Sequence, residues 1–409
     1  MTTKNEGLRI GVAAVDITPP AGVKLAGYGV RKGVATGVGH RLRAEALVAR
    51  GHGGAWALVT SDTVGYPRDL VLRVRQRIAA KTRLPAEAIM LSATHTHSGP
   101  AGMRTYDSDL QKVDLEYCRE LEERLVRLVV RAAQAAKPGS FEVAWTEAPE
   151  LASNRRVLRQ GGAAVNEWED PEGRHTGYYD PSVMLVAVRR PNGRRDALLV
   201  NYGCHPVTLG PRSLRISADY VGYLKDYLEA RGAAGLVLFA LAGAGNINPR
   251  VCIQVGAEHP RRMGERLGEI VHQATAKLHP VAAGPVAAGR QTWSLISKRD
   301  WPAGSGRKKG DVVETELLAL RAGDLALVSV PGELFSEYAA RLREASPLPE
   351  TVVVSLANDS VGYLPTDEAI AQGGHEVTHA AADGLEAALL EHAQKALAAL
   401  AARGSPACP

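Results

Sequence analysis

The chain has 409 residues, of which 45% are hydrophobic and 23% charged, a composition that excludes a disordered or fibrous protein. The formal net charge is +5, but basic and acidic residues are interspersed and no binding motif accompanies them, so we expect no nucleic-acid partner. No apolar run could span a bilayer, and residues 1–7 lack the pattern of a signal peptide. We therefore expect no stable membrane insertion and a cytoplasmic location.

Strand-like apolar runs alternate with helical patterns along the chain, which predicts an α/β protein with mixed β-sheets flanked by helices. The expected strands are 55–60, 89–94, 196–202, 235–241, 325–330 and 351–356. The expected helices are 68–81, 115–136, 220–231, 260–278, 333–344 and 380–402. Because no internal repeat or linker is apparent, one domain over residues 8–403 is predicted. The polar excursions 151–180 and 297–311 are hypothesised to cover an active site.

Residues 92–100 read Ser-Ala-Thr-His-Thr-His-Ser-Gly-Pro and follow an apolar run. In an extended backbone, side chains two residues apart project from the same face, so His95 and His97 would enter one cavity. Imidazole can bind metal or transfer protons near neutral pH. This segment therefore predicts a metal or acid–base site.

Two further apolar runs end in groups that can bind metal, namely His205 and Glu333. A glutamate at the start of a helix has a simpler explanation, because it complements the helix dipole. Ligands in open α/β sheets, however, bind beyond the C-terminal ends of strands, where these side chains could converge with His95. Two histidines and a glutamate form a known catalytic zinc set with one position open.

Three competing patterns are disfavoured. His375 to His379 match the HExxH pattern of zinc proteases, but that motif requires a continuous helix, and Thr378 is expected to cap a later helix. Residues 242–249 lack the third glycine of a dinucleotide fingerprint, so an active-site loop is expected, with Asn246 or Asn248 available to polarise a carbonyl. Cys204 adjoins His205, but adjacent residues of a strand point to opposite faces, which disfavours a cysteine nucleophile.

Considered together, these motifs resemble the catalytic domain of the neutral/alkaline, non-lysosomal ceramidase family. The blocks that carry the resemblance are Val15–Pro20, Gly27-Tyr28, Ser61-Asp62, Thr94–Pro100, Asn154-Arg155, His205-Pro206, Ser217–Tyr220, Gly245–Pro249, Pro331–Glu333 and Gly362-Tyr363. The block Thr94–Pro100 is highly specific to the family. The resemblance implies a single ceramidase-like catalytic domain, here expected without the C-terminal β-sandwich of full ceramidases.

The resemblance also implies an amidohydrolase with one catalytic zinc ion, acting on carbon–nitrogen bonds other than peptide bonds. Its metal ligands would be His95, His205, Glu333 and Tyr363. His97 and Arg155 would bind the substrate or the developing oxyanion. Where ceramidases carry a serine proposed to take part in catalysis, this chain has Asn248, so a serine-based step is not expected.

The expected mechanism is hydrolysis by water that the metal activates. His97, or alternatively Asp219, would act as general base, and Asn248 would assist the oxyanion. The substrate would be a small-molecule or lipid-like amide. Two alternatives stay open: a zinc esterase, lactonase or amidase acting on a small polar metabolite, and a non-catalytic binding protein with a zinc pocket. The residues do not indicate an oligomeric state.

Overall fold

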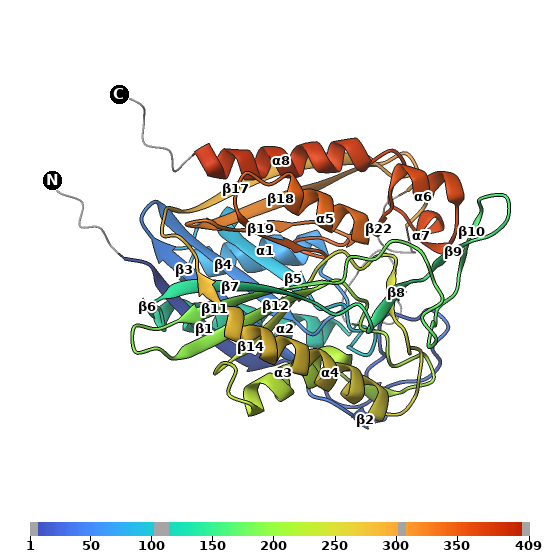
Figure 1. The fold of residues 1–409 in the computed structure, drawn as a ribbon, viewed down its shortest axis with the longest axis horizontal. Coiled ribbons are helices and arrows are strands. Elements are labelled where there is room, and N and C mark those ends of the chain that lie inside the picture. Colours follow the sequence, from blue (N-terminus) through green and yellow to red (C-terminus); the bar gives the residue numbers. More distant parts are fainter. Residues whose placement is uncertain (1–6, 102–113, 302–307, 403–409) are drawn as a thin grey trace.

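Three β-sheets form the frame of the structure, a computed structural model that describes residues 7–101, 114–301 and 308–402 (Figure 1). The first sheet contains β1 (Arg9–Asp16), β3 (Arg43–Gly51), β4 (Gly54–Ser61), β5 (Ile89–Ala93) and β6 (Lys137–Pro138). The second contains β7 (Ser140–Glu147), β11 (Ser182–Arg189), β12 (Arg195–Tyr202), β14 (Val237–Leu241) and β16 (His279–Pro280). The third contains β17 (Val286–Ile296), β18 (Val312–Ala322), β19 (Leu325–Ser329) and β21 (Glu350–Val354).

The helices and the short strand pairs lie around these sheets. The helices are α1 (Arg68–Ala79), α2 (Leu115–Gln134), α3 (Asp219–Ala230), α4 (Glu258–Ala274), α5 (Ser336–Glu344), α6 (Asp367–Gln372), α7 (His375–Thr378) and α8 (Glu386–Ala402). The short pairs are β2 (Gly37–Val38) with β13 (Arg215–Ile216), β8 (Ala152–Asn154) with β15 (Ile247–Pro249), β9 (Arg156–Leu158) with β10 (Ala164–Asn166), and β20 (Glu333–Leu334) with β22 (Tyr363–Leu364). Within the described ranges, no helix combines the length and apolarity needed to cross a bilayer.

The three sheets share one order of elements along the chain. In each, three successive strands pair antiparallel, a helix follows, the next strand pairs parallel with the third, and a second helix completes the unit. The units are β1-β3-β4-α1-β5-α2, β7-β11-β12-α3-β14-α4 and β17-β18-β19-α5-β21-α8. The expectation of no internal repeat is therefore wrong for topology, because the repeat lies in strand order and not in residue identity.

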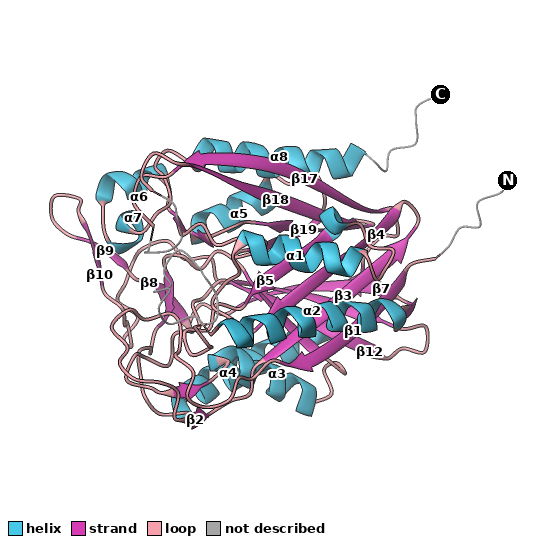
Figure 2. Ribbon diagram, turned by 180° about the vertical axis from the view of Figure 1, so that it is seen from behind, coloured by secondary structure: helices cyan, strands magenta, loops and turns pink. Residues whose placement is uncertain are grey.

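A shared core joins the sheets, and helices cover their outer faces. The shared core takes side chains from all three sheets, among them Leu58, Leu199 and Leu327. Outside it, α1 and α2 pack side by side on the first sheet (Figure 2). Helices α3 and α4 cover the second sheet, and α5 and α8 the third. Burial on both faces explains why the predicted strands are nearly all apolar.

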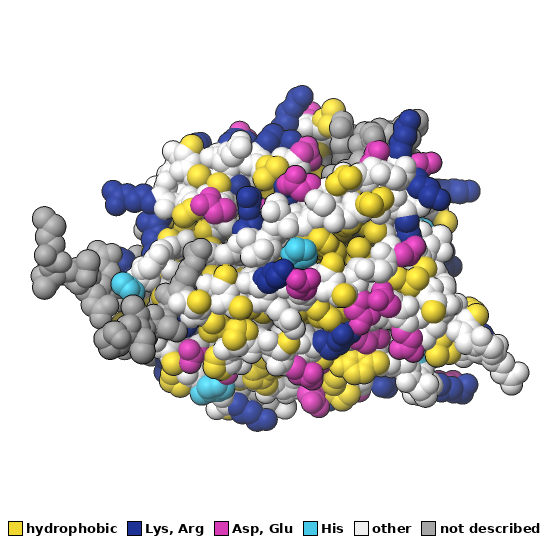
Figure 3. Space-filling view, turned by 90° about the horizontal axis from the view of Figure 1, so that it is seen from above, with side chains coloured by type: hydrophobic (Ala, Val, Ile, Leu, Met, Phe, Trp, Pro, Cys, Tyr) yellow, Lys and Arg dark blue, Asp and Glu magenta, His cyan; other side chains and the backbone are white. Residues whose placement is uncertain are grey.

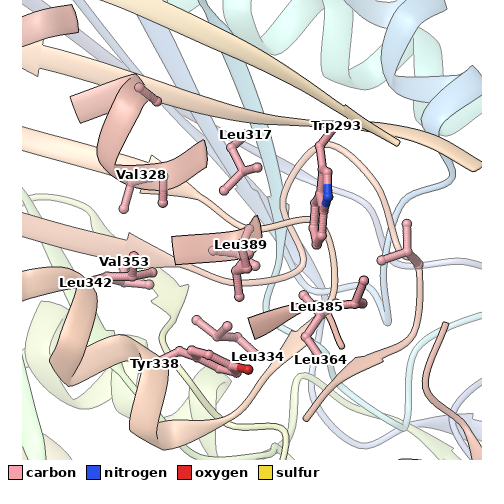
Figure 4. Packing of buried hydrophobic residues seen from close by; sticks show 14 of the residues in the cluster. Trp293, Leu317, Val328, Leu334, Tyr338, Leu342, Val353, Leu364, Leu385 and Leu389 are labelled. Carbon is pink, nitrogen blue, oxygen red and sulfur yellow. The ribbon is translucent and has the colours of Figure 1, made fainter. Parts of the chain in front are cut away.

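The last helix packs through leucines that recur at helical spacing. Leu385, just before α8, and Leu389 on it lie among buried side chains of the third sheet, including Leu317 and Trp293 (Figure 4). The opposite face of α8 carries the exposed pair Lys395 and Glu391. The side of the molecule seen from above Figure 1 shows basic and acidic side chains interspersed (Figure 3).

The predicted elements are found with shifted ends. All six expected strands are present, and the mixed α/β class is confirmed. The helix expected from residue 333 begins at Ser336, because Glu333 pairs in β20. The helix expected from residue 380 begins at Glu386, and Thr378 ends α7 instead of capping α8. The predicted domain boundary at residue 403 lies outside the described residues.

Candidate metal centre and active site

A cavity of about 620 Å³ lies beyond the C-terminal ends of the third and fourth strands of every unit. Its wall contains residues that come directly or shortly after each of these six strands. They include Val64 after β4, His95 and His97 after β5, Val207 after β12, Asn248 after β14, Glu333 after β19 and Tyr363 after β21. The convergence expected at strand ends is therefore present, and three sheets contribute to it instead of one.

Three imidazoles and one carboxylate meet at the base of this cavity. Nε2 of His205 lies 3.0 Å from Oε2 of Glu333, and Nε2 of His95 lies 3.4 Å from the same oxygen. Nε2 of His97 lies 3.2 Å from Nε2 of His95. Ligand atoms of the three histidines all lie within 4.8 Å of one another. Such an arrangement offers several nitrogen and oxygen donors to one small cation.

The outer nitrogens of two of these imidazoles are tied to the backbone. Nδ1 of His95 donates to the carbonyl oxygen of Val64 at 2.6 Å, and Nδ1 of His205 donates to that of Ala244 at 2.6 Å. A carbonyl oxygen only accepts, so in both residues Nδ1 carries the proton and Nε2 presents its lone pair to the cluster around Glu333. His95 adopts a positive φ of 72°, a strained conformation of the kind that gathers at functional sites.

Glu333 and Tyr363 lie side by side because β20 and β22 pair them directly. Their side chains are only 3% and 5% exposed. A hydrogen bond joins the Tyr363 hydroxyl to the Glu333 carboxylate, and the same hydroxyl accepts from Nη2 of Arg155 at 3.0 Å. The helix-dipole explanation for Glu333 fails, since α5 begins three residues later. Instead, the pairing places this carboxylate at the cavity.

Burial and charge set the protonation of the cluster. Burial lowers the pKa of His97 well below its usual value, and burial together with Arg155 lowers the pKa of His205 to about 4. Burial opposes ionisation of Glu333, but His95 and His205 hold its pKa well below the usual range. A neutral imidazole at His205 and an ionised carboxylate at Glu333 are the forms that bind metal, so these donors fit a zinc ion.

Arg155 lies beside this cluster and is held by Asn248. Its Nη1 donates to Oδ1 of Asn248 at 2.9 Å, which fixes the orientation of the amide because a guanidinium cannot accept. The amide nitrogen Nδ2 of Asn248 in turn donates to the carbonyl oxygen of Trp168 at 3.0 Å and lies 3.7 Å from Sγ of Cys252. Asn248 therefore anchors Arg155, and its own donors are directed away from an oxyanion role.

Residues 8–260 match the family described as neutral/alkaline non-lysosomal ceramidase, N-terminal. The chain belongs to this family.

Curated relatives include neutral ceramidase A of Dictyostelium discoideum, 25% identical over 259 residues that cover 59% of this chain and 36% of that protein. Neutral ceramidase of Pseudomonas aeruginosa is 25% identical over 287 residues, which cover 67% of this chain and 42% of the relative. The chain thus matches about two fifths of these relatives' length or less. The crystal structure of the Pseudomonas aeruginosa enzyme has the same fold, with a TM-score of 0.83 and 19% identity over 99% of this chain and 77% of that one. A structure titled as a ceramidase complexed with C2 gives a TM-score of 0.82 at 19% identity and covers 97% of this chain and 76% of that one.

Asp219, expected as an alternative general base, is not brought to the cavity of this ceramidase-family chain. Its carboxylate accepts hydrogen bonds from Oγ1 of Thr208 at 2.5 Å and from the amides of Leu209 at 3.0 Å and Tyr220 at 2.7 Å. It is fully buried and is not part of the cavity wall. Asp219 therefore fastens the loop that follows His205 to the start of α3.

The HExxH segment folds differently from a zinc-protease helix. His375 and His379 line the cavity wall, but α7 is a single turn, and the two histidines belong to no group of three possible metal ligands among the described residues. Glu376 is fully buried and paired with Arg155 and Arg156, so it is not free to act as the base of a zinc protease.

The cavity walls above the cluster combine apolar and cationic side chains. The apolar ones include Leu25, Val30, Trp168, Val207 and Ile253, and the cations besides Arg155 are Lys24 and Arg31. The 151–180 excursion contributes Arg155 and Trp168, in line with the covering role hypothesised for it. The 297–311 excursion lies partly outside the described residues, and its described residues do not line the cavity. Sequence reasoning missed Arg31 and Trp168, since neither stands in a spacing that marks a site.

Gly27 provides a local test of the site. It has a φ of 90°, and a Cβ placed there would lie 2.4 Å from Cγ of His97. We expect Gly27→Ala to displace the His97 ring and to lower kcat by about 10²-fold, because misplacement by about 1 Å has effects of that size. Steady-state kinetics on the best substrate would measure this. Gly22→Ala is the matched control, since Gly22 has a φ of 94° and no heavy atom within 4 Å of its Cβ position. Equal losses in both variants would show that backbone strain, and not His97, is responsible.

Proposed function

We propose that this chain is a zinc-dependent hydrolase that cleaves the N-acyl amide bond of a small-molecule or lipid-like substrate. The observation that carries the proposal is the convergence of Nε2 of His95 and of His205 on the Glu333 carboxylate, with both Nδ1 atoms tied to the backbone. Membership of the neutral/alkaline ceramidase family supports it. His95, His205 and Glu333 would hold the metal, with Tyr363 as a fourth ligand beside Glu333.

A zinc ion at these donors would supply Lewis acidity for the scissile carbonyl and a water molecule that is deprotonated near neutral pH. Arg155 would donate an N–H to the carbonyl oxygen as negative charge develops on it. Neutral His97 can accept a proton at Nε2, which lies among the donor atoms, and return it to the leaving amine. Asn248 takes part by orienting Arg155.

The size, apolar surface and charge of the cavity indicate which amides could bind. A volume of about 620 Å³ lies within the range of sites for drug-sized ligands, and the apolar side chains offer a surface to an acyl chain. Lys24 and Arg31 add positive charge on the same wall. A neutral sphingolipid is therefore one member of the proposed substrate class, and acyl amides with an acidic amine portion are another.

A panel of matched substrates tests the proposal. Ceramide, an N-acylethanolamine, an N-acyl amino acid, a short-chain acyl amide and the corresponding esters would be incubated with zinc-loaded and chelator-treated protein, and the released acid and amine quantified. We expect release from N-acyl amides that a chelator abolishes and added zinc restores. Turnover of esters alone would favour an esterase or lactonase. Turnover of none of them by zinc-loaded protein would favour the non-catalytic binding protein.

A further inference from the structure

Glu376 is a buried carboxylate that the proposed chemistry does not use. Its side chain is 0% exposed. Oε1 accepts from Nε of Arg155 at 2.7 Å and from Nδ2 of Asn166 at 2.6 Å, and Oε2 accepts from Nη1 of Arg156 at 2.9 Å. A carboxylate so deeply buried needs such partners, because an unpaired charge in this environment is strongly destabilising. Glu376 thus joins α7 to two adjacent arginines at the cavity wall.

The donors of Arg155 are almost entirely committed. A guanidinium has five N–H groups. One is taken by Glu376, one by Oδ1 of Asn248, one by the carbonyl oxygen of Gly245 and one by the Tyr363 hydroxyl. Within the described part of the chain, one N–H of Nη1 is left without a partner. Arg155 is part of the cavity wall, and this N–H is the donor that its protein partners leave over.

We infer that Glu376 is a positioning residue for amide hydrolysis, which sets the plane of the Arg155 guanidinium so that its free Nη1 N–H faces the substrate carbonyl. The inference rests on the proposed function. Because the guanidinium is planar and rigid, the bond at Nε fixes the directions of both Nη groups at once. Arg156 and Asn166 occupy the rest of the carboxylate and prevent it from rotating. Glu376 therefore acts through Arg155 and does not touch the substrate.

Glu376→Gln is the first variant to test. Glutamine has the same shape but only one acceptor oxygen, so its amide N–H₂ group must face a donor of Arg155, Asn166 or Arg156. We expect kcat to fall by about 10²-fold with little change in KM and with zinc content unchanged.

Glu316→Gln is the matched control. Glu316 is 1% exposed and pairs with Nη1 of Arg75 at 2.6 Å, away from the cavity. This variant should lose stability and keep its kcat. An equal loss of kcat in both variants would mean that Glu376 is merely structural.

A double-mutant cycle tests whether Glu376 affects kcat through Arg155. In the Arg155→Met background, Glu376→Gln should change kcat by less than about twofold, because the group that it positions is already gone. If Glu376→Gln lowers kcat by the same factor with and without Arg155, the inference is overturned.

A measurement independent of turnover separates this inference from the proposed function. The ¹⁵N-coupled Nε–H signal of Arg155, assigned by its loss in Arg155→Met, should exchange slowly with water in the unmodified protein and in Glu316→Gln. In Glu376→Gln it should exchange at least about tenfold faster, because the charge-assisted bond at Nε is weakened. An unchanged signal would overturn the inference even if amides are cleaved. A changed signal would support the positioning even if no panel substrate is cleaved and the proposed function fails.

Discussion

Replacing His205 with alanine is expected to leave only traces of zinc in the purified protein and to lower amide turnover by roughly 10³-fold or more. The imidazole contributes Nε2 to the cluster and is held by the carbonyl oxygens of Ala244 and Ile247 at Nδ1. Loss of a ligand removes metal-based stabilisation worth several kcal/mol in the transition state, which corresponds to this rate factor. Elemental analysis and kcat/KM would be measured on the same preparation.

Two other histidines make this prediction specific. His97→Ala should keep its zinc and lose about 10²–10⁴-fold in kcat, because it removes proton transfer and not a ligand. The side chain of His279 lies on β16, is 55% exposed and is not part of the cavity wall, so His279→Ala should resemble the unmodified protein. Full zinc content in His205→Ala would refute the assigned ligand set. Zinc loss in His97→Ala would make His97 a ligand.

The second large effect concerns folding. Lys225 on α3 is 0% exposed, and its Nζ donates to Oε1 of Glu45 at 2.9 Å and to Oδ1 of Asp62 at 2.9 Å. Lys225→Met leaves two buried carboxylates without their main counter-charge. We expect the free energy of unfolding to fall by about 3–5 kcal/mol, as for other broken buried pairs. Urea denaturation followed by circular dichroism would measure it.

The loss in Lys225→Met should depend on pH. Burial already raises the pKa of Glu45, and removal of the ammonium group raises it further. A carboxyl group whose folded-state pKa is raised binds its proton more tightly in the folded state. The loss of folding free energy that its ionisation causes therefore grows as the pH rises toward that pKa. The variant should therefore be less destabilised near about pH 5.5 than near about pH 8.

Lys395→Met serves as the control for this experiment. Lys395 is paired with Glu391 on the surface of α8, and the side chains are 56% and 60% exposed. Its removal should cost less than about 0.5 kcal/mol, as for exposed pairs one helical turn apart. A Lys225→Met variant no less stable than Lys395→Met would contradict the importance of the buried network.

The strand ends were the predictable part of the site. Alternation along a strand and the rule for ligand binding at strand ends suffice to bring His95, His205 and Glu333 together. Apolar runs also located the strands that are buried on both faces, because such strands carry an unbroken hydrophobic signal. Tyr363 came only from the family resemblance, since a lone tyrosine after a turn has no spacing that marks it as a ligand.

Other features depend on contacts distant in the sequence. Glu376 meets Arg155 across 221 positions, and no local pattern encodes that pairing. Asp219 follows the expected ligand His205 in the sequence, but its carboxylate faces the loop at Thr208. Its positive φ of 55° could not be predicted from the residue type. The start of α5 was misplaced because Glu333 pairs with Tyr363, a contact that overrides local helix propensity.

The common strand order of the three units bears on how the site is assembled. Three units of one topology surround a shared core, and the cavity lies at the same end of each. The family match ends at residue 260, within α4, and so covers the strands of the first two units, whereas Glu333 and Tyr363 come from the third. Each unit supplies at least one donor atom to the cluster of His95, His205 and Glu333. A metal ion bound there would therefore stabilise only a chain in which all three units have folded and come together.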